Sequence, residues 1–253
     1  MTPLNLPAML LAAGRGERMR PLTDSTPKPL LRVQQRPLLD WHMAALQRDG
    51  VRQVVVNTAW LGAQIPAHLD STWATQGMQL QYSHEQQDFG HALETAGGIA
   101  RALPLLGEAF WLAAGDVFTP DFVFDAAAAQ RFASSSDLAH VWLVPNPAHN
   151  LLGDFGLQES DAGTGRALNL PREAAMQDGR PRFTYSTIAL LKADLFRPPW
   201  CDIAPGNPQG VAAPLAVLLR KAMDAGRCGA SCYTGRWTDV GTPERLAALN
   251  TVS

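Results

Sequence analysis

The chain contains few cysteines and little charge of either sign. Cysteine occurs only at Cys201, Cys228 and Cys232 among 253 residues. A sparse, odd-numbered set excludes a disulfide-stapled fold and favours a reducing compartment, so we expect a cytoplasmic protein. Lys and Arg number 21 against 23 Asp and Glu, which leaves a formal charge of -2. This balance excludes the broad basic face that nucleic-acid binding requires, and no nucleic-acid partner is expected.

Long hydrophobic runs are also missing. The longest apolar run near the beginning is Met9–Ala13, inside Leu4–Gly14, and it is too short to span a bilayer. Lys and Arg do not precede it, so the basic region of a signal peptide is absent as well. We therefore expect a buried first strand and no membrane partner. The hydrophobic fraction of 46% is typical of a globular chain rather than a disordered one.

What the sequence does contain is an alternation of strand and helix patterns. Apolar and β-branched runs predict strands at Pro7–Ala13, Val51–Asn57, Met78–Ser83, Phe110–Ala114, Leu138–Pro145, Phe155–Gln158, Phe183–Leu191, Gly229–Tyr233 and Trp237–Val240. Helical spacing predicts helices at Pro37–Asp49, Gly62–Leu69, Thr95–Leu106, Asp121–Phe132, Ala213–Ala225 and from Thr242-Pro243 onward. Pro104 is expected to end its helix early, and Asn146–Gly153 and Ser160–Arg182 are expected to be irregular. The alternation predicts an α/β protein, with a mostly parallel mixed sheet and helices on both faces.

The loop after the first strand carries the strongest chemical signal. The strand runs into Gly14-Arg-Gly16, and several basic residues follow. Glycine lets a backbone approach phosphate oxygens without a Cβ in the way, and successive N–H groups form a cradle for anions. In open α/β sheets, ligands bind beyond the carboxyl ends of the strands. A ligand that carries phosphate is therefore expected at this loop.

Two common phosphate loops do not fit this segment. A dinucleotide fingerprint requires glycine where Met19 stands, which disfavours a dehydrogenase, and a P-loop requires Gly-Lys-Ser/Thr where Gly16-Glu17-Arg18 stands. A longer pattern does fit, namely Gly14-x-Gly16-x-Arg18-x-x-Pro21-Leu22-Thr23-x-x-x-Pro27-Lys28. It resembles, at every position, the signature of the sugar-1-phosphate nucleotidyltransferases, which are also called nucleotide-sugar pyrophosphorylases.

Other segments extend this resemblance over nearly the whole chain. Leu93–Gly98 is similar to the family's base-binding segment, and Ala114-Gly115-Asp116 is similar to its metal-binding Gly-Asp. Trp237-x-Asp239-x-Gly241-Thr242 is similar to its late metal-binding segment. The resemblance implies a Rossmann-like nucleotide-diphospho-sugar transferase fold. We predict one domain over residues 1–253, with a nucleotide-binding half at about 7–135 and a sugar-phosphate-binding half at about 136–253.

Within the family, the chain most resembles the branch that acts on N-acetylmuramate 1-phosphate with UTP. The residues that carry this likeness are Asn57-x-Ala59-Trp60-Leu61-Gly62, Asn146-Pro147-x-His149-x-x-x-Gly153-Asp154-Phe155 and Trp237–Thr242. The branch implies glycine at two positions and asparagine at a third where this chain has Ala96, Thr187 and Ala114. These departures lie near the expected base and sugar contacts. They therefore leave the substrate less defined than the reaction.

The resemblance also implies a set of functional residues. It gives catalytic roles to Arg18, Lys28 and Asp116, and a Mg²⁺ site to Asp116 and Asp239. The expected nucleotide-binding residues are Leu11, Ala12, Ala13, Gly14, Gly16, Arg18, Glu94, Gly97 and Gly98. The expected sugar-phosphate-binding residues are Lys28, Asn146, His149, Asp154 and Thr187.

The implied reaction joins two anions, an NTP and a sugar 1-phosphate. A phosphomonoester has a second pKa near about 6, so the attacking phosphate is already largely dianionic at neutral pH and needs no general base. The protein has to neutralise and align the reactants instead. Arg18 and Lys28 suit this task, and hard carboxylate oxygens suit Mg²⁺.

Several assignments have structural alternatives. Arg18 and Arg20 can be solvated surface charges, Asp116 can be a turn residue, and Glu94 can simply begin a helix. His149 can be a satisfied loop histidine, and Trp60 is interpreted as core or pocket wall.

Two functional alternatives stay open. One is a thymidylyl-, guanylyl- or cytidylyltransferase that acts on another sugar phosphate or alcohol phosphate. The other is a non-catalytic regulatory protein that binds nucleotide sugars. The sequence does not indicate the oligomeric state.

Overall fold

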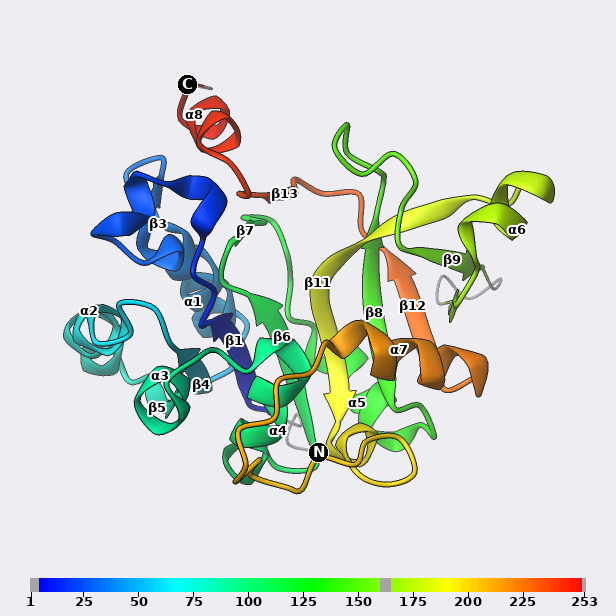
Figure 1. Cartoon of the computed structure of the whole chain (residues 1–253), viewed down its shortest axis with the longest axis horizontal. Coiled ribbons are helices and arrows are strands. Elements are labelled where there is room, and N and C mark those ends of the chain that lie inside the picture. The colour runs from blue at the N-terminus through cyan, green and yellow to red at the C-terminus, as the bar shows by residue number, and fades with distance from the viewer. Residues whose placement is uncertain (1–4, 160–164, 252–253) are drawn as a thin grey trace.

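A nine-stranded mixed sheet runs through the computed structural model, which describes residues 5–159 and 165–251 (Figure 1). Its strand order is β5-β4-β1-β6-β11-β8-β12-β10-β9. The strands are β1 (Ala8–Ala12), β4 (Gln53–Thr58), β5 (Gln79–His84), β6 (Ala109–Ala114), β8 (Ala139–Val144), β9 (Phe155–Gln158), β10 (Gly165–Leu168), β11 (Arg182–Lys192) and β12 (Cys228–Cys232). Two short ribbons pair β2 (Arg32–Val33) with β3 (Arg36–Pro37) and β7 (Val117–Phe118) with β13 (Thr238–Asp239).

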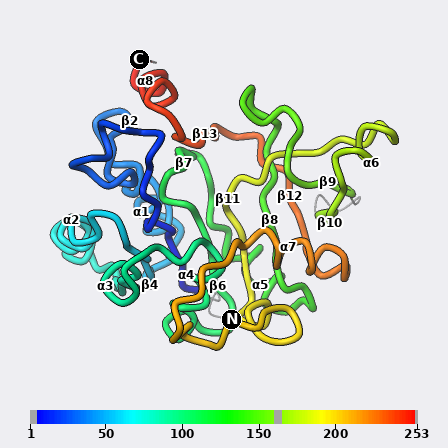
Figure 2. Tube along the Cα trace, viewed as in Figure 1, coloured from blue at the N-terminus to red at the C-terminus, as the bar shows by residue number. Residues whose placement is uncertain are grey.

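Helices cover both faces of this sheet (Figures 1 and 2). They are α1 (Leu38–Arg48), α2 (Gln64–Thr72), α3 (Glu85–Phe89), α4 (Glu94–Leu106), α5 (Ala126–Ser134), α6 (Arg172–Gln177), α7 (Leu215–Asp224) and α8 (Pro243–Thr251). Apolar side chains of α4 and α7 form one core with one face of the sheet, and those of α1, α2 and α5 form a second core with the other. On β11, Leu191 enters the first core and Leu190 the second, as strand alternation requires.

The part of the sheet formed by β5, β4, β1 and β6 is entirely parallel. Ala8 of β1 lies opposite Val54 of β4 on one side and Trp111 of β6 on the other. A strand with neighbours on both sides and helices on both faces is buried all round, which explains why β1 is apolar at every position. Because the strands are parallel, the loops that follow β1, β4 and β6 emerge at one edge of the sheet.

The rest of the sheet mixes both directions. β11 is antiparallel to β6 and β8, β12 is parallel to β8, and β10 and β9 are antiparallel to their neighbours. The register of β11 shifts between Tyr185 and Ala189, and Thr187 inside this irregularity has a φ of 63°. A β-branched residue rarely adopts the left-handed region. The glycine that the family resemblance implies at position 187 fits this backbone without strain.

The architecture confirms the expected α/β class, but three local predictions were wrong. The first concerns Pro104, which lies inside α4 and does not end it. A proline cannot donate to the carbonyl four residues earlier, here that of Ala100. Gly206 N donates to that carbonyl instead, at 2.9 Å, so the helix continues to Leu106 without an unpaired acceptor.

The second correction is the start of α5, which begins at Ala126 and not at Asp121. The Asp125 side chain caps this helix by accepting hydrogen bonds from Ala127 N and Ala128 N, both at 3.0 Å. The third correction is in the segment expected to be irregular, which contains β10 and α6. β10 is held by local pairing with β9 and by long-range pairing with β12, and its four residues carry no strand pattern of their own. Residues 169–171 and 178–181 are irregular as predicted, and 160–164 lie outside the described residues.

Among the residues that the structure describes, none of the helices is long and apolar enough to cross a membrane.

Candidate active site

Two adjoining cavities lie at the edge where the parallel strands end. The first has a volume of about 240 Å³ and is lined by Leu11, Ala12, Ala13, Gly14, Lys28, Pro29, Asn57, Glu85, Ala92, Glu94, Thr95, Ala114 and Asp116. The second has a volume of about 420 Å³ and is lined by Leu11, Glu94, Thr95, Leu112, Ala114, Tyr185, Thr187, Pro214, Leu215, Ala216 and Leu219. The two share Leu11, Glu94, Thr95 and Ala114. A ligand with two parts can therefore occupy both.

The signature loop after β1 folds tightly around Thr23, which is fully buried. Thr23 Oγ1 donates to the Gly16 carbonyl at 2.8 Å. Gly16 has a φ of 66°, and a Cβ there would lie 3.0 Å from Thr23 Cγ2 and 3.1 Å from Lys28 Cβ. The glycine is thus required for the closure of the loop as well as for backbone access to phosphate.

Trp60, in the loop that follows β4, anchors this signature loop. Its indole Nε1 donates to the Thr23 carbonyl at 2.8 Å. The Arg15 guanidinium lies 3.5 Å from the centroid of the same indole and also donates to the Thr23 carbonyl. Trp60 therefore contacts the loop rather than the hydrophobic core. The sequence analysis gave no role to Arg15, because a variable position between two glycines carries no signal of its own.

Three predicted basic residues of this loop differ in their surroundings. Lys28 is 9% exposed, and its Nζ forms an ion pair with Asp116 Oδ2. Arg18 is exposed and lies outside the described lining of both cavities. Arg20 pairs with Asp24 on the surface at 2.8 Å. The structure thus brings Lys28 directly to the predicted metal site.

Asp116 and Asp239 approach each other through the ribbon of β7 and β13. Asp239 lies opposite Val117 in this ribbon, and Val240 N donates to the Asp116 carbonyl at 2.9 Å. Trp237 Nε1 donates to the Ser186 carbonyl at 3.0 Å and ties the same segment to β11. The ribbon of β7 and β13 therefore brings Asp116 and Asp239 together, although they are more than a hundred positions apart in the chain.

The carboxylate of Asp239 is surrounded by positive or protonatable groups. Its Oδ1 lies 2.7 Å from His149 Nε2 and 2.5 Å from Arg245 Nη1. This oxygen is nevertheless buried without a hydrogen bond of good geometry. Gly241 makes room for the guanidinium, because a Cβ there would lie 2.6 Å from Arg245 Nη2. Arg245 was not predicted from the sequence. It lies in the first turn of α8, where a basic residue in a mostly exposed helix carries no functional signal.

Carboxylate oxygens such as those of Asp116 and Asp239 are of the ligand type that Mg²⁺ prefers. No group of three or more Asp, Glu, His or Cys side chains suited to a metal ion occurs within residues 5–159 and 165–251. Mg²⁺ does not need one, because it commonly takes one or two carboxylates together with substrate phosphates and waters. In the structure, Asp239 Oδ1 pairs with Arg245 and His149, and Asp116 Oδ2 pairs with Lys28, so a Mg²⁺ ion would have to share or replace these partners.

Asn57 and Glu85 line the first cavity and were not assigned in the sequence analysis. Glu85 is fully buried, and its carboxylate accepts from Asn57 Nδ2 and from Leu93 N, both at 2.7 Å. Asn57 Oδ1 accepts from Ala12 N at 2.8 Å. Burial raises the pKa of Glu85, while the hydrogen bonds from Leu93 and Asn57 oppose that shift. Asn57 lies near the end of β4 and Glu85 directly follows β5, so both residues stand at the edge where the parallel strands end.

The predicted base-binding segment has two different functions. Glu94 has a φ of 55°, begins α4 and lines both cavities. Gly97 and Gly98 are not among the residues that line either cavity. A Cβ at Gly97 would lie 2.3 Å from the Val211 carbonyl, and one at Gly98 would lie 2.5 Å from Glu85 Oε1. These two glycines therefore permit close packing of α4.

The predicted sugar-phosphate residues are spread over a wider area. Thr187 lines the second cavity. Asn146 Nδ2 donates to the Arg182 carbonyl at 2.9 Å, and Asp154 Oδ2 accepts from Tyr185 N at 2.9 Å. These bonds brace the loop between β8 and β9, and the structure places both side chains outside the described lining of the two cavities.

Tyr185 lines the second cavity and was not predicted. Burial raises the pKa of its phenol. Its hydroxyl oxygen is buried and has no hydrogen-bond partner among the residues that the structure describes.

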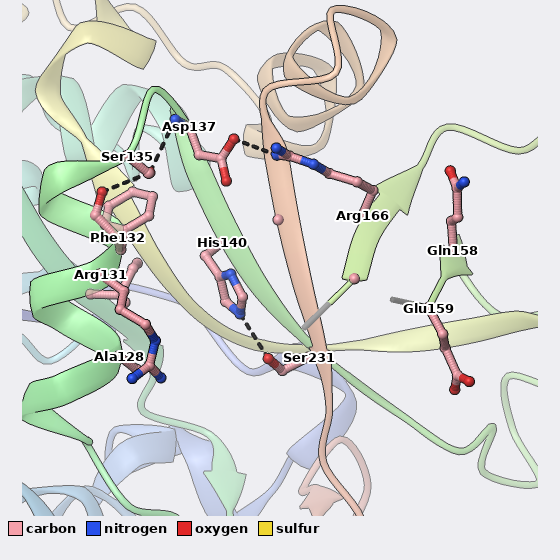
Figure 3. A pocket seen from close by; sticks show the side chains of 13 residues that line it. Ala128, Arg131, Phe132, Ser135, Asp137, His140, Gln158, Glu159, Arg166 and Ser231 are labelled. Atoms are coloured by element: carbon pink, nitrogen blue, oxygen red, sulfur yellow. Dashed lines mark hydrogen bonds and ion pairs between the residues drawn. The ribbon is translucent and has the colours of Figure 1, made fainter. Parts of the chain in front are cut away.

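A third cavity of about 420 Å³ lies on the opposite face of the sheet, beside α5 (Figure 3). His140 Nε2 and Ser231 Oγ are 2.9 Å apart in it, and the Arg166 guanidinium pairs with Asp137. Burial lowers the pKa of His140 to about 4. None of the predicted catalytic residues lines this cavity in the described part of the chain, whereas Lys28 and Asp116 line the first cavity.

Comparisons with known proteins agree with this geometry. The family model described as "Nucleotidyl transferase" matches residues 7–252. The chain is 43% identical to the N-acetylmuramate alpha-1-phosphate uridylyltransferase of Neisseria meningitidis serogroup B, over 94% of each protein. It is 30% identical to the protein of the same name from Caulobacter vibrioides, over 95% of this chain and 94% of that one.

Solved structures show the same fold at low sequence identity. An apo UDP-glucose pyrophosphorylase aligns with a TM-score of 0.74 at 15% identity, covering 98% of this chain and 97% of that one. A putative glucose-1-phosphate thymidylyltransferase from Bacillus anthracis aligns with a TM-score of 0.72 at 18% identity, covering 97% and 94%. The family model spans nearly the whole chain, and the signature loop, the paired aspartates and the two cavities lie together. The chain belongs to the nucleotidyl transferase family.

Proposed function

We propose that the protein transfers a uridylyl group from UTP to N-acetylmuramate 1-phosphate and releases pyrophosphate. The observation that carries this proposal is the meeting of Lys28, Asp116 and Asp239 beside two adjoining cavities. The names of the two relatives described above support the choice of base and sugar. The scarcity of cysteine supports a cytoplasmic location.

In this proposal, the first cavity holds the nucleotide. The backbone of Leu11–Gly14 and the turn at Glu94 form its walls. Arg18 neutralises charge on the outgoing pyrophosphate from its exposed position next to the loop. The second cavity holds the sugar, with Thr187 and Tyr185 as its polar contacts. The two phosphate-bearing ends then meet where the cavities adjoin.

Lys28 lies where the sugar phosphate has to reach the α-phosphorus. Its ammonium is paired with Asp116, so bound phosphate oxygens have to share or replace that partner. A fixed positive charge at the reacting phosphate stabilises charge that develops in the transition state, and such a group is typically worth about 10²–10³ in rate. Mg²⁺, held by Asp116 and Asp239, would supply further positive charge to the phosphate oxygens.

The experiment that tests this proposal measures product formation. Purified protein with Mg²⁺ is incubated with each NTP and a panel of sugar 1-phosphates, and pyrophosphate release is followed. The proposal predicts the highest kcat/KM for UTP with N-acetylmuramate 1-phosphate. A preference for dTTP, GTP or CTP would replace the uridylyl assignment. Tight binding of a nucleotide sugar without pyrophosphate release from any pair would indicate a regulatory binding protein.

A further inference from the structure

A continuous chain of buried hydrogen bonds ties together two walls of the first cavity. One wall is the end of β1, and the other is the turn before α4. Ala12 N donates to Asn57 Oδ1 at 2.8 Å, Asn57 Nδ2 donates to Glu85 Oε1 at 2.7 Å, and Leu93 N donates to Glu85 Oε2 at 2.7 Å. Asn57 is 3% exposed and Glu85 is fully buried, so water does not compete for these bonds.

The backbone fixes the direction of every bond in this chain. Ala12 N–H and Leu93 N–H can only donate, so the side chains between them must present acceptors at both ends. Asn57 therefore turns its oxygen to Ala12 and its nitrogen to Glu85. Both oxygens of Glu85 then accept a hydrogen bond, which favours the ionised carboxylate and opposes the effect of burial on its pKa. The orientation of Asn57 thus follows from the two backbone groups.

A fully buried carboxylate is costly, and one of its partners is the backbone donor of Leu93 at the start of α4. Helix α4 has a glycine where it packs against this carboxylate. A Cβ at Gly98 would lie 2.5 Å from Glu85 Oε1 and 3.0 Å from Asn57 Nδ2. Both Asn57 and Glu85 line the cavity that takes the nucleotide. Because the buried Glu85 carboxylate links two walls of this cavity, we expect it to maintain the spacing between them.

We propose that Asn57 and Glu85 are a positioning pair, which holds the end of β1 and the Leu93–Glu94 turn at the spacing that nucleotide binding requires. The pair acts on the nucleotide through these two backbone segments and not by direct contact. The inference rests on the proposed function in one respect, namely that the first cavity is the nucleotide site. It predicts an effect on nucleotide affinity that is separate from any effect on the sugar phosphate.

Two single variants and their combination test the pair. In Asn57→Asp, a carboxylate oxygen at position 57 faces a carboxylate oxygen of Glu85. In Glu85→Gln, the new side-chain N–H group faces a second donor, which is either Asn57 Nδ2 or the backbone N–H of Leu93. The double variant N57D/E85Q restores every bond with the carboxylate moved to position 57. We expect each single variant to raise the KM for the NTP about tenfold, which corresponds to about 1.4 kcal/mol. The KM for the sugar 1-phosphate should change less than about twofold, and the double variant should recover to within about threefold of the original KM for the NTP.

Asp40→Asn is the matched control. Asp40 is also a buried carboxylate, 6% exposed, and accepts from Trp73 Nε1 at 2.8 Å and His68 Nε2 at 2.9 Å. It lies outside the described lining of the first cavity. Its replacement should lower the melting temperature and leave the KM for the NTP unchanged. If a single variant of the pair is insoluble, Glu85→Asp replaces it, because it keeps the charge and shortens the reach by one methylene.

Specific outcomes would overturn the inference. One is that the single variants lower only the melting temperature, as Asp40→Asn does. Another is that N57D/E85Q recovers stability but not nucleotide affinity. If the unaltered protein uses an NTP other than UTP, the uridylyl proposal fails, and the same variants measured with that NTP still decide the role of the pair.

Discussion

The two parts of the sheet position functional residues in different ways. On the parallel side, β1, β4 and β6 end at one edge, with Asn57 near the end of β4 and with the signature loop and Asp116 just after β1 and β6. On the mixed side, strands run in both directions, and Asn146 and Asp154 brace a loop outside the described lining of the cavities. Parallel pairing therefore gathers residues from short local segments, whereas mixed pairing leaves the site dependent on long-range contacts.

The largest effect is expected for Asp116 and Asp239, which come from different parts of the chain and meet at the proposed cation site. Asp116→Asn should abolish turnover, and Asp239→Asn should lower kcat by at least about 10²–10³, since both are proposed to hold one cation beside the phosphates. Pyrophosphate release at saturating substrates is the measurement. Asp121→Asn is the control, because Asp121 pairs with Arg236 on the surface at 2.6 Å. Near-normal turnover in either active-site variant would remove that aspartate from the proposed metal site.

Replacing Lys28 tests whether this residue of the parallel side contributes to the chemical step or only to substrate binding. Lys28→Ala should lower kcat by about 10² while the Kd for UTP rises less, because its charge is proposed to act at the transferring phosphate. Stopped-flow turnover and equilibrium binding of UTP give the two values. An effect confined to UTP affinity contradicts this role. Lys221→Ala, which alters an exposed lysine that donates to the Trp200 carbonyl, serves as the control.

Gly98 packs against the parallel part of the sheet and Gly153 against the mixed part, so substituting each one tests which substrate each part binds. In Gly98→Ala, the new Cβ would meet Glu85 Oε1 at 2.5 Å, and in Gly153→Ala it would meet Phe183 N at 2.8 Å at a φ of 59°. Each should destabilise the fold by about 1–3 kcal/mol. Gly98→Ala should raise mainly the KM for UTP, and Gly153→Ala mainly that for the sugar phosphate. The same change in both KM values for both variants would show that the two sides are not separate in function.

Two histidines, one on each side, are expected to affect the pH dependence of stability and not turnover. Burial lowers the pKa of both His42 and His140 to about 4. The unfolded chain binds these protons below a pH of about 6.5, so stability is fully present above that pH and is lost as the pH falls towards 4, by at most about 1.4 kcal/mol per pH unit for each histidine. His42→Gln and His140→Gln should each reduce this pH dependence, measured by urea unfolding between pH 7 and pH 4.5. Unchanged pH dependence in both variants would rule out these histidines as its source.

Much of the parallel side follows from local sequence. Apolar runs bounded by turn residues located β1, β4 and β6, and the spacing of Gly14, Gly16 and Lys28 indicated a phosphate loop, because both signals lie within a few residues of each other. The helix through Pro104 was mispredicted, since the donor that compensates for the proline is Gly206 N, from a segment about a hundred residues away.

Composition and local pattern by themselves indicated the α/β class and a phosphate-binding loop, whereas Asp116 and Asp239 were proposed from the family resemblance. Only the tertiary structure decided that Asp116 and Asp239 meet across a ribbon, that Arg245 and His149 approach Asp239, and that Glu85 is buried between two walls of a cavity. The physical reason is that periodicity and capping act within a few residues. A pairing between distant segments depends on how the whole chain packs, and no local pattern encodes it.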